Sequence, residues 1–80
     1  MSNSLPFDQL LDASGLACPM PLLKTKLALK NLQAGEVLKV VASDAGSWRD
    51  IPKFAALASH ELIASAEVDN QYLFWIRKGV

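Results

Sequence analysis

The sequence predicts an α+β domain, a two-layer sandwich in which a four-stranded mixed sheet carries two helices on one face. The hydrophobic patterns follow the order β-α-β-α-β-β, and two helices are too few to cover both faces of such a sheet. The chain has 80 residues, of which 51% are hydrophobic, which is enough for one core and too short for two. We expect a flexible tail over residues 1–6 and a single domain over residues 7–80.

The first half of the chain predicts a strand, a helix and a buried strand. Residues 7–12 favour a strand that ends at the turn signal Ser14-Gly15. Residues 19–34 favour a helix, because prolines fit its first turn and Gly35 can end it. Residues 36–42 are short and rich in β-branched side chains, as in a buried strand. The expected inward face of the helix comprises Leu22, Thr25, Ala28, Leu29 and Leu32.

A second helix is expected over residues 47–59. Ser47 and Asp50 are spaced as in a weak capping box, which would open the helix. Pro52 lies early enough in the helix to be tolerated. The expected inward stripe comprises Trp48, Ile51, Phe54, Ala55 and Ala58.

The last part of the chain predicts a β-hairpin. Residues 61–68 and 72–78 favour strands, and residues 69–71 form a plausible turn between them. In the last strand we expect Phe74 and Ile76 to face the helices, which leaves Trp75 partly exposed on the open face of the sheet.

Composition excludes several classes of site. Eight basic and eight acidic side chains give a net charge of zero, which argues against nucleic-acid binding by phosphate neutralisation alone. One cysteine and one histidine cannot form an internal disulfide or a typical zinc centre, so we expect no metal and no cofactor. The sequence shows no secretion signal and no apolar run of membrane-spanning length, so we expect a cytoplasmic protein without membrane contact.

The only thiol, Cys18, is predicted to lie at or next to the N-terminus of the first helix. The helix dipole and the free N–H groups there stabilise an anion, and the nearest donors would be the Met20 and Leu22 amides. Pro19 and Pro21 stiffen the turn and present the sulfur. We therefore expect a thiol that ionises more readily than that of a free cysteine. The alternative is that Cys18 is a small buried hydrophobe.

His60 is the only histidine that could serve as a base for Cys18. It is predicted near the end of the second helix, about 20 Å from the start of the first. We expect it to be a cation near a helix C-terminus or a half-exposed surface residue. A cysteine without a base suits chemistry in which sulfur itself is the cargo, held as a persulfide without a cofactor.

Two further groups of residues are expected beside Cys18. The segment 43–50 should lie at the same edge of the sheet, where Arg49 could pair with an anionic persulfide or a partner carboxylate. We expect Asp50 to cap its own helix, whereas Asp44 would raise the thiol pKa if it lies close. A second apolar stripe on the first helix is either core beneath the first strand or a docking surface; it comprises Met20, Leu23 and Leu27.

Several segments together resemble the TusA/SirA-like sulfur-carrier family from Phe7 to Gly79. They are Leu11-Asp12, Gly15-Leu16-Ala17-Cys18-Pro19-Met20-Pro21, Gly35-Glu36, Arg49-Asp50-Ile51-Pro52-Lys53-Phe54 and Ile76-Arg77-Lys78-Gly79. The resemblance implies a βαβαββ sandwich whose Cys18 accepts persulfide sulfur from a cysteine desulfurase. A further acceptor protein then receives the sulfur, in the best-known relay toward 2-thiouridine in tRNA.

Neighbouring residues complete the predicted site. We expect the thiolate environment and the surface on which partners dock to comprise Pro19, Met20, Pro21, Arg49 and Asp50. The chain departs from many members at Ala17, Met20, Asp44-Ala45 and Trp48, which alters the surface that selects donor and acceptor.

Two other functions fit the sequence. One is a nucleic-acid-binding or regulatory interaction module, for which five basic residues could share a face; they are Lys24, Lys26, Lys30, Arg49 and Lys53. The other is a thiol redox sensor, which would react with peroxide faster than with a desulfurase persulfide.

Overall fold

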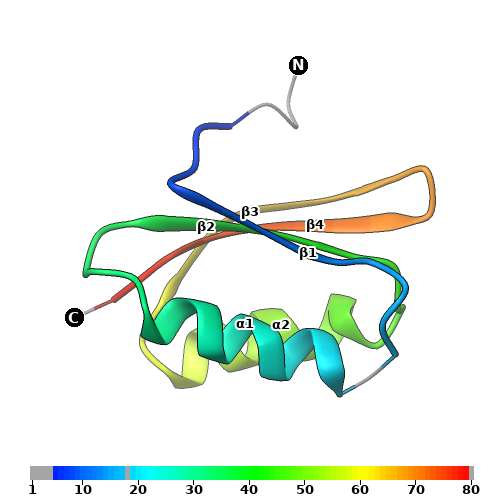
Figure 1. Ribbon diagram of the computed structural model, residues 1–80, viewed down its shortest axis with the longest axis horizontal. Helices are drawn as coiled ribbons and strands as arrows, with labels where there is room; N and C mark the ends of the chain where they lie inside the picture. The colour runs from blue at the N-terminus through cyan, green and yellow to red at the C-terminus, as the bar shows by residue number, and fades with distance from the viewer. Residues whose placement is uncertain (1–4, 18, 80) are drawn as a thin grey trace.

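The computed structural model describes residues 5–17 and 19–79, and its elements follow the predicted order. They are β1 (Gln9–Ala13), α1 (Met20–Lys30), β2 (Val37–Ala42), α2 (Ser47–Leu57), β3 (Glu61–Val68) and β4 (Gln71–Arg77). Over these described residues the strands form one four-stranded sheet in the order β1-β2-β4-β3. Both helices lie on the same face of it (Figure 1). The predicted fold class is confirmed.

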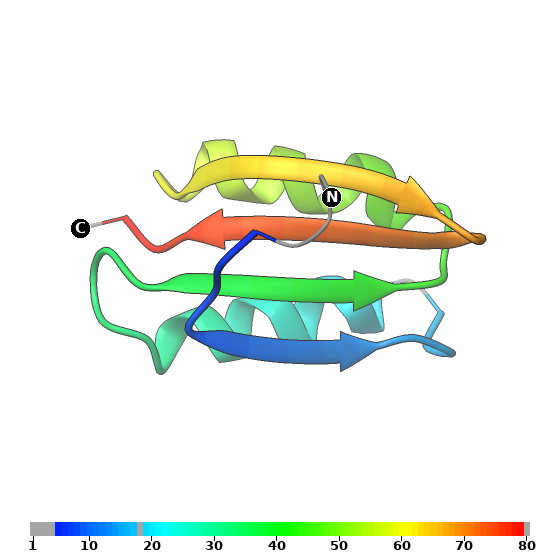
Figure 2. The same cartoon turned by 90° about the horizontal axis from the view of Figure 1, so that it is seen from above.

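The two helices run in the same direction. β1 pairs with β2 in parallel, and β4 pairs antiparallel with both β2 and β3, so β2 and β3 are parallel to each other. Each helix therefore connects two parallel strands and returns against their direction. Both helices begin at the edge of the sheet where β1 and β2 end (Figure 2).

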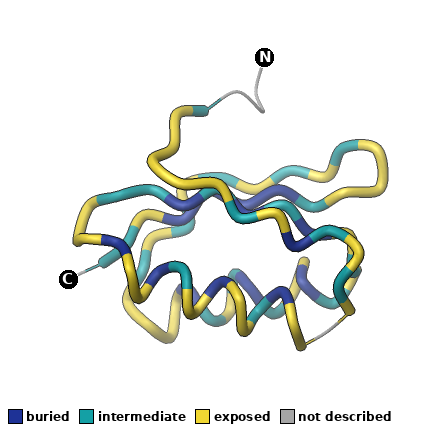
Figure 3. The backbone as a smooth tube through the Cα atoms, in the orientation of Figure 1, coloured by how far each residue is buried: buried dark blue, intermediate teal, exposed yellow. Residues whose placement is uncertain are grey.

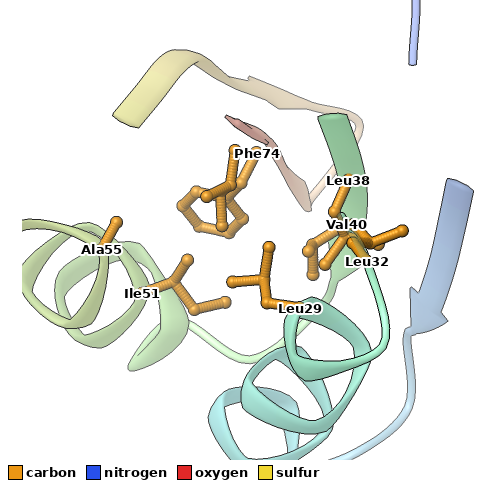
Figure 4. Packing of buried hydrophobic residues seen from close by; sticks show 8 residues of the cluster. Leu29, Leu32, Leu38, Val40, Ile51, Ala55 and Phe74 are labelled. Carbon is orange, nitrogen blue, oxygen red and sulfur yellow. The ribbon is translucent and has the colours of Figure 1, made fainter. Parts of the chain in front are cut away.

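The core lies between the helices and the sheet. Figure 3 marks the buried residues along the backbone of the helices and the sheet, and Figure 4 shows that Leu29 of α1 and Ile51 of α2 lie against Phe74 of β4. The hydroxyl of the buried Thr25 donates to the Pro21 carbonyl oxygen at 2.8 Å, which satisfies its polar group. The buried cluster comprises Leu29, Leu32, Leu38, Val40, Ile51, Ala55, Phe74 and Ile76.

The predicted inward face of α1 is confirmed, whereas that of α2 is only partly right. Thr25, Leu29 and Leu32 are buried, and Leu22 and Ala28 are half-buried. In α2, Ile51 and Ala55 are buried and Phe54 is half-buried. Trp48 and Ala58 are exposed instead. The Trp48 ring lies at the margin of the layer, 5.6 Å from the Tyr72 ring and 5.9 Å from the Phe74 ring.

α1 ends at Lys30, four residues before the predicted end. The Leu32 amide donates to the Leu29 carbonyl, which tightens the chain after the last helical turn. The Lys78 ammonium donates to the Leu32 carbonyl oxygen at 2.6 Å and covers this helix end. Gly35 has a φ of 92° but lies in the following loop rather than next to the helix.

The start of α2 corrects the predicted capping box. The N-cap residue is Gly46, and the structure shows no side-chain cap there. Ser47 is therefore the first helical residue, and Asp50 is the fourth, one position too far along to close the box. Asp44 shapes the turn instead, because its carboxylate accepts the Gly46 N–H at 3.0 Å and its carbonyl oxygen accepts the Ser47 N–H.

The hairpin between β3 and β4 is confirmed, with a shorter turn than predicted. Asp69 and Asn70 have φ angles of 51° and 64°, and Val68 pairs directly with Gln71. This left-handed two-residue turn suits the twist of an antiparallel pair. β3 carries a bulge between Leu62 and Ala64.

The expectation that Trp75 is partly exposed is wrong. Phe74 and Ile76 face the helices as predicted, but Trp75, on the opposite face, is only 1% exposed. Its indole N–H donates to the Leu5 carbonyl oxygen at 3.3 Å. Residues 5–8, which we call the strap, cross the second face of the sheet before β1 begins at Gln9 (Figure 1). Residues 1–4 of the predicted tail lie outside the described residues.

Candidate functional site

The candidate site lies at the edge where β1 and β2 end and both helices begin. Cys18 itself lies outside the described residues. The site is therefore built from the loop before it, the first turn of α1 after it, and the start of α2.

The loop before Cys18 is ordered by hydrogen bonds from both sides. The Asp12 carboxylate accepts the Ser14 N–H at 3.0 Å and the Ser14 hydroxyl at 2.5 Å. These two bonds lower the pKa of Asp12 below its usual value, the hydroxyl having the larger effect. Gly15, with a φ of 81°, then donates its N–H to the Ser43 hydroxyl oxygen at 2.7 Å. The segment 43–50 thus lies at the same edge as the loop, as predicted.

The first turn of α1 presents small and apolar side chains. Ala17, Pro19 and Met20 are exposed, whereas Pro21 is buried. Pro19 is the N-cap residue, so the helix begins one residue later than predicted. The Met20 N–H donates to the Ala17 carbonyl oxygen at 2.9 Å, so it is not available as a donor to sulfur.

Arg49 and Asp50 lie in the first turns of α2 and contact each other. The Arg49 Nε lies 3.4 Å from the Asp50 Oδ1, and the Arg49 side chain is 83% exposed. An ion pair this exposed contributes little to stability. The expectation that Asp50 caps its helix is wrong, for the positional reason given above. Arg49 is placed where an incoming anionic group can reach it.

A groove between α1 and α2 was not predicted. Its volume is about 340 Å³, and Leu57 on its wall is 77% exposed. The Lys26 ammonium lies 5.4 Å from the centre of the Phe54 ring, within range of a cation–π contact. The sequence predicted Phe54 as a core residue. In the structure it is half-buried and lines the groove, because α1 and α2 lie side by side. The lining comprises Leu22, Lys26, Asp50, Lys53, Phe54, Leu57 and Ala58.

The second apolar stripe of α1 is not core. Met20, Leu23 and Leu27 are 41%, 44% and 63% exposed. The first of the two predicted alternatives is therefore wrong, because the buried face of α1 that contacts the sheet is the one containing Thr25 and Leu29. The stripe is exposed and is not part of the groove lining, which leaves a docking surface as the remaining alternative.

Charge is divided between the two layers. The helices carry one acidic side chain, Asp50, and five basic ones, a net charge of +4. The remaining residues carry seven acidic and three basic side chains. The chain as a whole is therefore neutral, but its helical layer is basic. Its cations are the predicted Lys24, Lys26, Lys30, Arg49 and Lys53.

His60 has a structural environment at the other end of α2. Its Nδ1 accepts the Gly79 N–H at 2.9 Å, and its ring lies 5.7 Å from the Phe54 ring. Burial and, to a smaller extent, the Lys78 charge lower the pKa of His60. Of the two predicted alternatives, the half-exposed residue is right and the cation at the helix end is wrong, because the Nδ1 of His60 accepts a hydrogen bond. It follows the end of α2, whereas the candidate site lies at the start of the helices.

Two features are absent from the described residues. Within 5–17 and 19–79, no three or more His, Cys, Asp or Glu side chains form a group that could hold a metal ion. None of the helices in this part of the chain is both long enough and apolar enough to cross a membrane.

Comparison with known proteins agrees with the resemblance. The family model described as sulfurtransferase TusA matches residues 9–78. The sulfur carrier protein TusA of Pseudomonas entomophila (strain L48) is 48% identical over 76 residues, 95% of each chain. That of Pseudomonas putida (strain W619) is 48% identical over 71 residues, 89% of each chain. The crystal structure of a SirA-like protein from Desulfitobacterium hafniense covers 91% of this chain and all of that one, with a TM-score of 0.80 and 28% identity.

Proposed function

The chain belongs to the TusA family of sulfurtransferases, and from this premise we propose that it carries sulfur as a persulfide on Cys18. The observation that carries the proposal is the family match over residues 9–78, which includes the only thiol of the chain. The geometry around it supports the proposal, because Ala17, Pro19 and Met20 are all exposed.

The proposed reaction moves one sulfur atom without net oxidation or reduction. The Cys18 thiolate attacks the terminal sulfur of a persulfide on a cysteine desulfurase. The sulfur–sulfur bond of the donor breaks, the donor cysteine leaves as a thiolate, and a new sulfur–sulfur bond forms on Cys18. A nucleophile on an acceptor protein then attacks the terminal sulfur, and Cys18 leaves as a thiolate. Each step exchanges one such bond for another, so no cofactor is needed.

The helix start supports the ionised form of the thiol. The first amides of a helix and its dipole favour a nearby anion, and a thiolate is the nucleophilic form of cysteine. Leu22, in the first turn of α1, remains the predicted amide donor, because the Met20 N–H is taken. Arg49 supplies an exposed positive charge at the same edge, either for the persulfide or for a partner carboxylate.

We place partner docking on the helical layer. Two apolar features of this layer are available to partners: the exposed stripe of Met20, Leu23 and Leu27, which begins at the first residue of α1, and the groove that Phe54 and Leu57 line. The layer has a net charge of +4, so the complementary partner surface combines apolar side chains with carboxylates. Donor and acceptor reach the same thiol, so they bind in turn rather than together.

Intact-mass analysis tests the proposal. Incubation of the chain with a cysteine desulfurase and free cysteine should add one sulfur atom per chain. The Cys18→Ser variant should remain unmodified, and treatment with a reductant should return the loaded chain to its original mass. An unchanged mass of the wild-type chain would contradict the proposal. Relay of this sulfur to the 2-thiouridine of tRNA belongs to the same proposal; a deletion strain assayed for thiolated tRNA tests it.

A nucleic-acid-binding module is the second candidate, and the basic helical layer favours it. Such binding would survive Cys18→Ser and would weaken steeply as salt rises, because phosphate contacts release counterions. A gel-shift titration against single-stranded RNA at two salt concentrations distinguishes it. The carrier function predicts no such binding.

A further inference from the structure

We infer that Ser43 is a positioning residue for the loop that precedes Cys18 in the sequence, an inference that rests on the proposed function. Ser43 directly follows β2, and its hydroxyl oxygen accepts the Gly15 N–H at 2.7 Å. This hydrogen bond joins two loops that lie 28 residues apart in the sequence. After β1 ends at Ala13, the other hydrogen bonds given for residues 14–17 are local, such as those between Asp12 and Ser14.

The sheet brings Ser43 and Gly15 together. Ala13 pairs with Ala42 in the parallel ladder, so β1 and β2 end side by side and their loops leave the sheet at the same level. Both alanines are fully buried, which fixes the last residue of each strand. Gly15 then adopts a φ of 81°, a conformation that L side chains rarely adopt, and donates to Ser43.

The hydrogen bond fixes one end of a short loop whose other end is already fixed. α1 is held by the buried Thr25 and Leu29, and its first amide, of Met20, donates to Ala17. Only two residues, Leu16 and Ala17, separate Gly15 from Cys18. Without the Ser43 hydroxyl, the Gly15 end of this loop would no longer be held to β2. The conformation of the residues between Gly15 and the start of α1 could then change.

The contact is separable from folding. Ser43 and Gly15 are both exposed, so water can replace the hydroxyl as acceptor when it is removed. A change at Ser43 should therefore alter transfer more than stability. Ser43 need not touch the donor or its sulfur, so its effect should appear in the maximal rate of transfer rather than in donor binding.

Three variants test the inference: Ser43→Ala, Ser43→Thr, which keeps the hydroxyl, and Ser65→Ala, an exposed serine on β3, as the matched control. Sulfur transfer from a cysteine desulfurase is measured by intact mass as the donor concentration rises. We expect Ser43→Ala to lower the maximal rate about fivefold, which corresponds to the loss of one hydrogen bond. The half-saturating donor concentration should stay unchanged. The maximal rate of Ser43→Thr should stay within about twofold of the wild-type rate, and the rate of Ser65→Ala should equal the wild-type rate.

Alkylation of the single thiol with iodoacetamide provides a readout that does not depend on the desulfurase. In Ser43→Ala the pH midpoint of alkylation should move upward, because a displaced loop loses part of the stabilisation by the helix start. A wild-type rate and an unmoved midpoint in Ser43→Ala would overturn the inference, as would a Thr variant as slow as the Ala variant. If the wild type accepts no sulfur, the proposed function fails, and the alkylation profile still decides the role of Ser43.

Discussion

At the scale of single residues, three polar side chains each form a hydrogen bond with a backbone group. Thr25 donates to the Pro21 carbonyl, Ser43 accepts from Gly15, and His60 accepts from Gly79. None of these partners could be predicted from the sequence, because each depends on how two segments approach each other. His60 illustrates this best: its place after a helix left a cation and a half-exposed residue as alternatives, and only its contact with Gly79 shows that its Nδ1 is an acceptor.

His60 should make stability depend on pH in a defined direction. The pKa of His60 is lowered in the folded chain, so protons bind more tightly to the unfolded chain. Above the ordinary value of 6.5 this group costs no stability, and stability falls as the pH drops through 6.5 toward the lower folded pKa. Urea unfolding between about pH 7.5 and about pH 5 should show this loss.

The matched variant for this measurement is His60→Gln, whose amide oxygen can accept the Gly79 N–H without titrating. It should show a flatter dependence over the same range. A His60→Gln variant as sensitive to pH as the wild type would assign the effect to other groups. The Asp12 carboxylate does not confound the comparison, because its pKa is lowered in the folded chain and it titrates at more acidic pH. The stability that Asp12 contributes is present above its ordinary pKa and is lost as the pH falls through its lower folded pKa.

At the scale of elements, the sequence predicts which segments form helices and strands better than where they end. β3 has the predicted bounds, because its pattern is flanked by clear turn signals. The predicted end of α1 was wrong, because the chain after the helix is held by Lys78 and not ended directly by Gly35. The predicted cap of α2 was wrong, because Asp44 and not Ser47 accepts a backbone N–H at the helix start. The groove could not be predicted, since it exists only where two helices run side by side.

The groove makes a prediction about donor binding. Leu57 is 77% exposed, so Leu57→Ser should change the free energy of unfolding by less than about 0.5 kcal/mol. If the groove receives the donor, the same variant should raise the half-saturating desulfurase concentration several-fold. Leu10→Ser, which alters a 52% exposed leucine on β1 away from the groove, is the matched control. Equal effects of the two variants on donor binding would contradict docking at the groove.

At the scale of the whole molecule, one face of the sheet is covered fully and the other only in part, since Leu10 on the same face as Trp75 is 52% exposed. Two helices cover one face, and the strap covers Trp75 on the other. The alternation in β4 correctly placed Phe74 and Ile76 inside, but it could not show that a segment before β1 returns across the sheet. The Lys39 ammonium strengthens this cover, since it lies 5.4 Å from the Phe7 ring and 5.2 Å from the Trp75 ring.

Removal of residues 1–7 should therefore expose Trp75. We expect its fluorescence to shift to the red and the free energy of unfolding to fall by about 2 kcal/mol, because most of a large aromatic surface loses its cover. Trp48 is replaced by Phe in both chains so that a single indole reports. An unshifted emission spectrum of the truncated chain would show that the strap does not bury Trp75 in solution. The loading of sulfur at the other edge should be unaffected.

The carrier function requires that sulfur both arrives and leaves. The most direct measurement loads the chain with isotopically heavy sulfur from labelled cysteine through a desulfurase, removes the desulfurase, and adds a small thiol as acceptor. Mass spectrometry should find one heavy sulfur on the peptide containing Cys18, and then its complete loss to the acceptor with the peptide otherwise unchanged. Label that never reaches this peptide, or that stays on it in the presence of the thiol, would contradict the account.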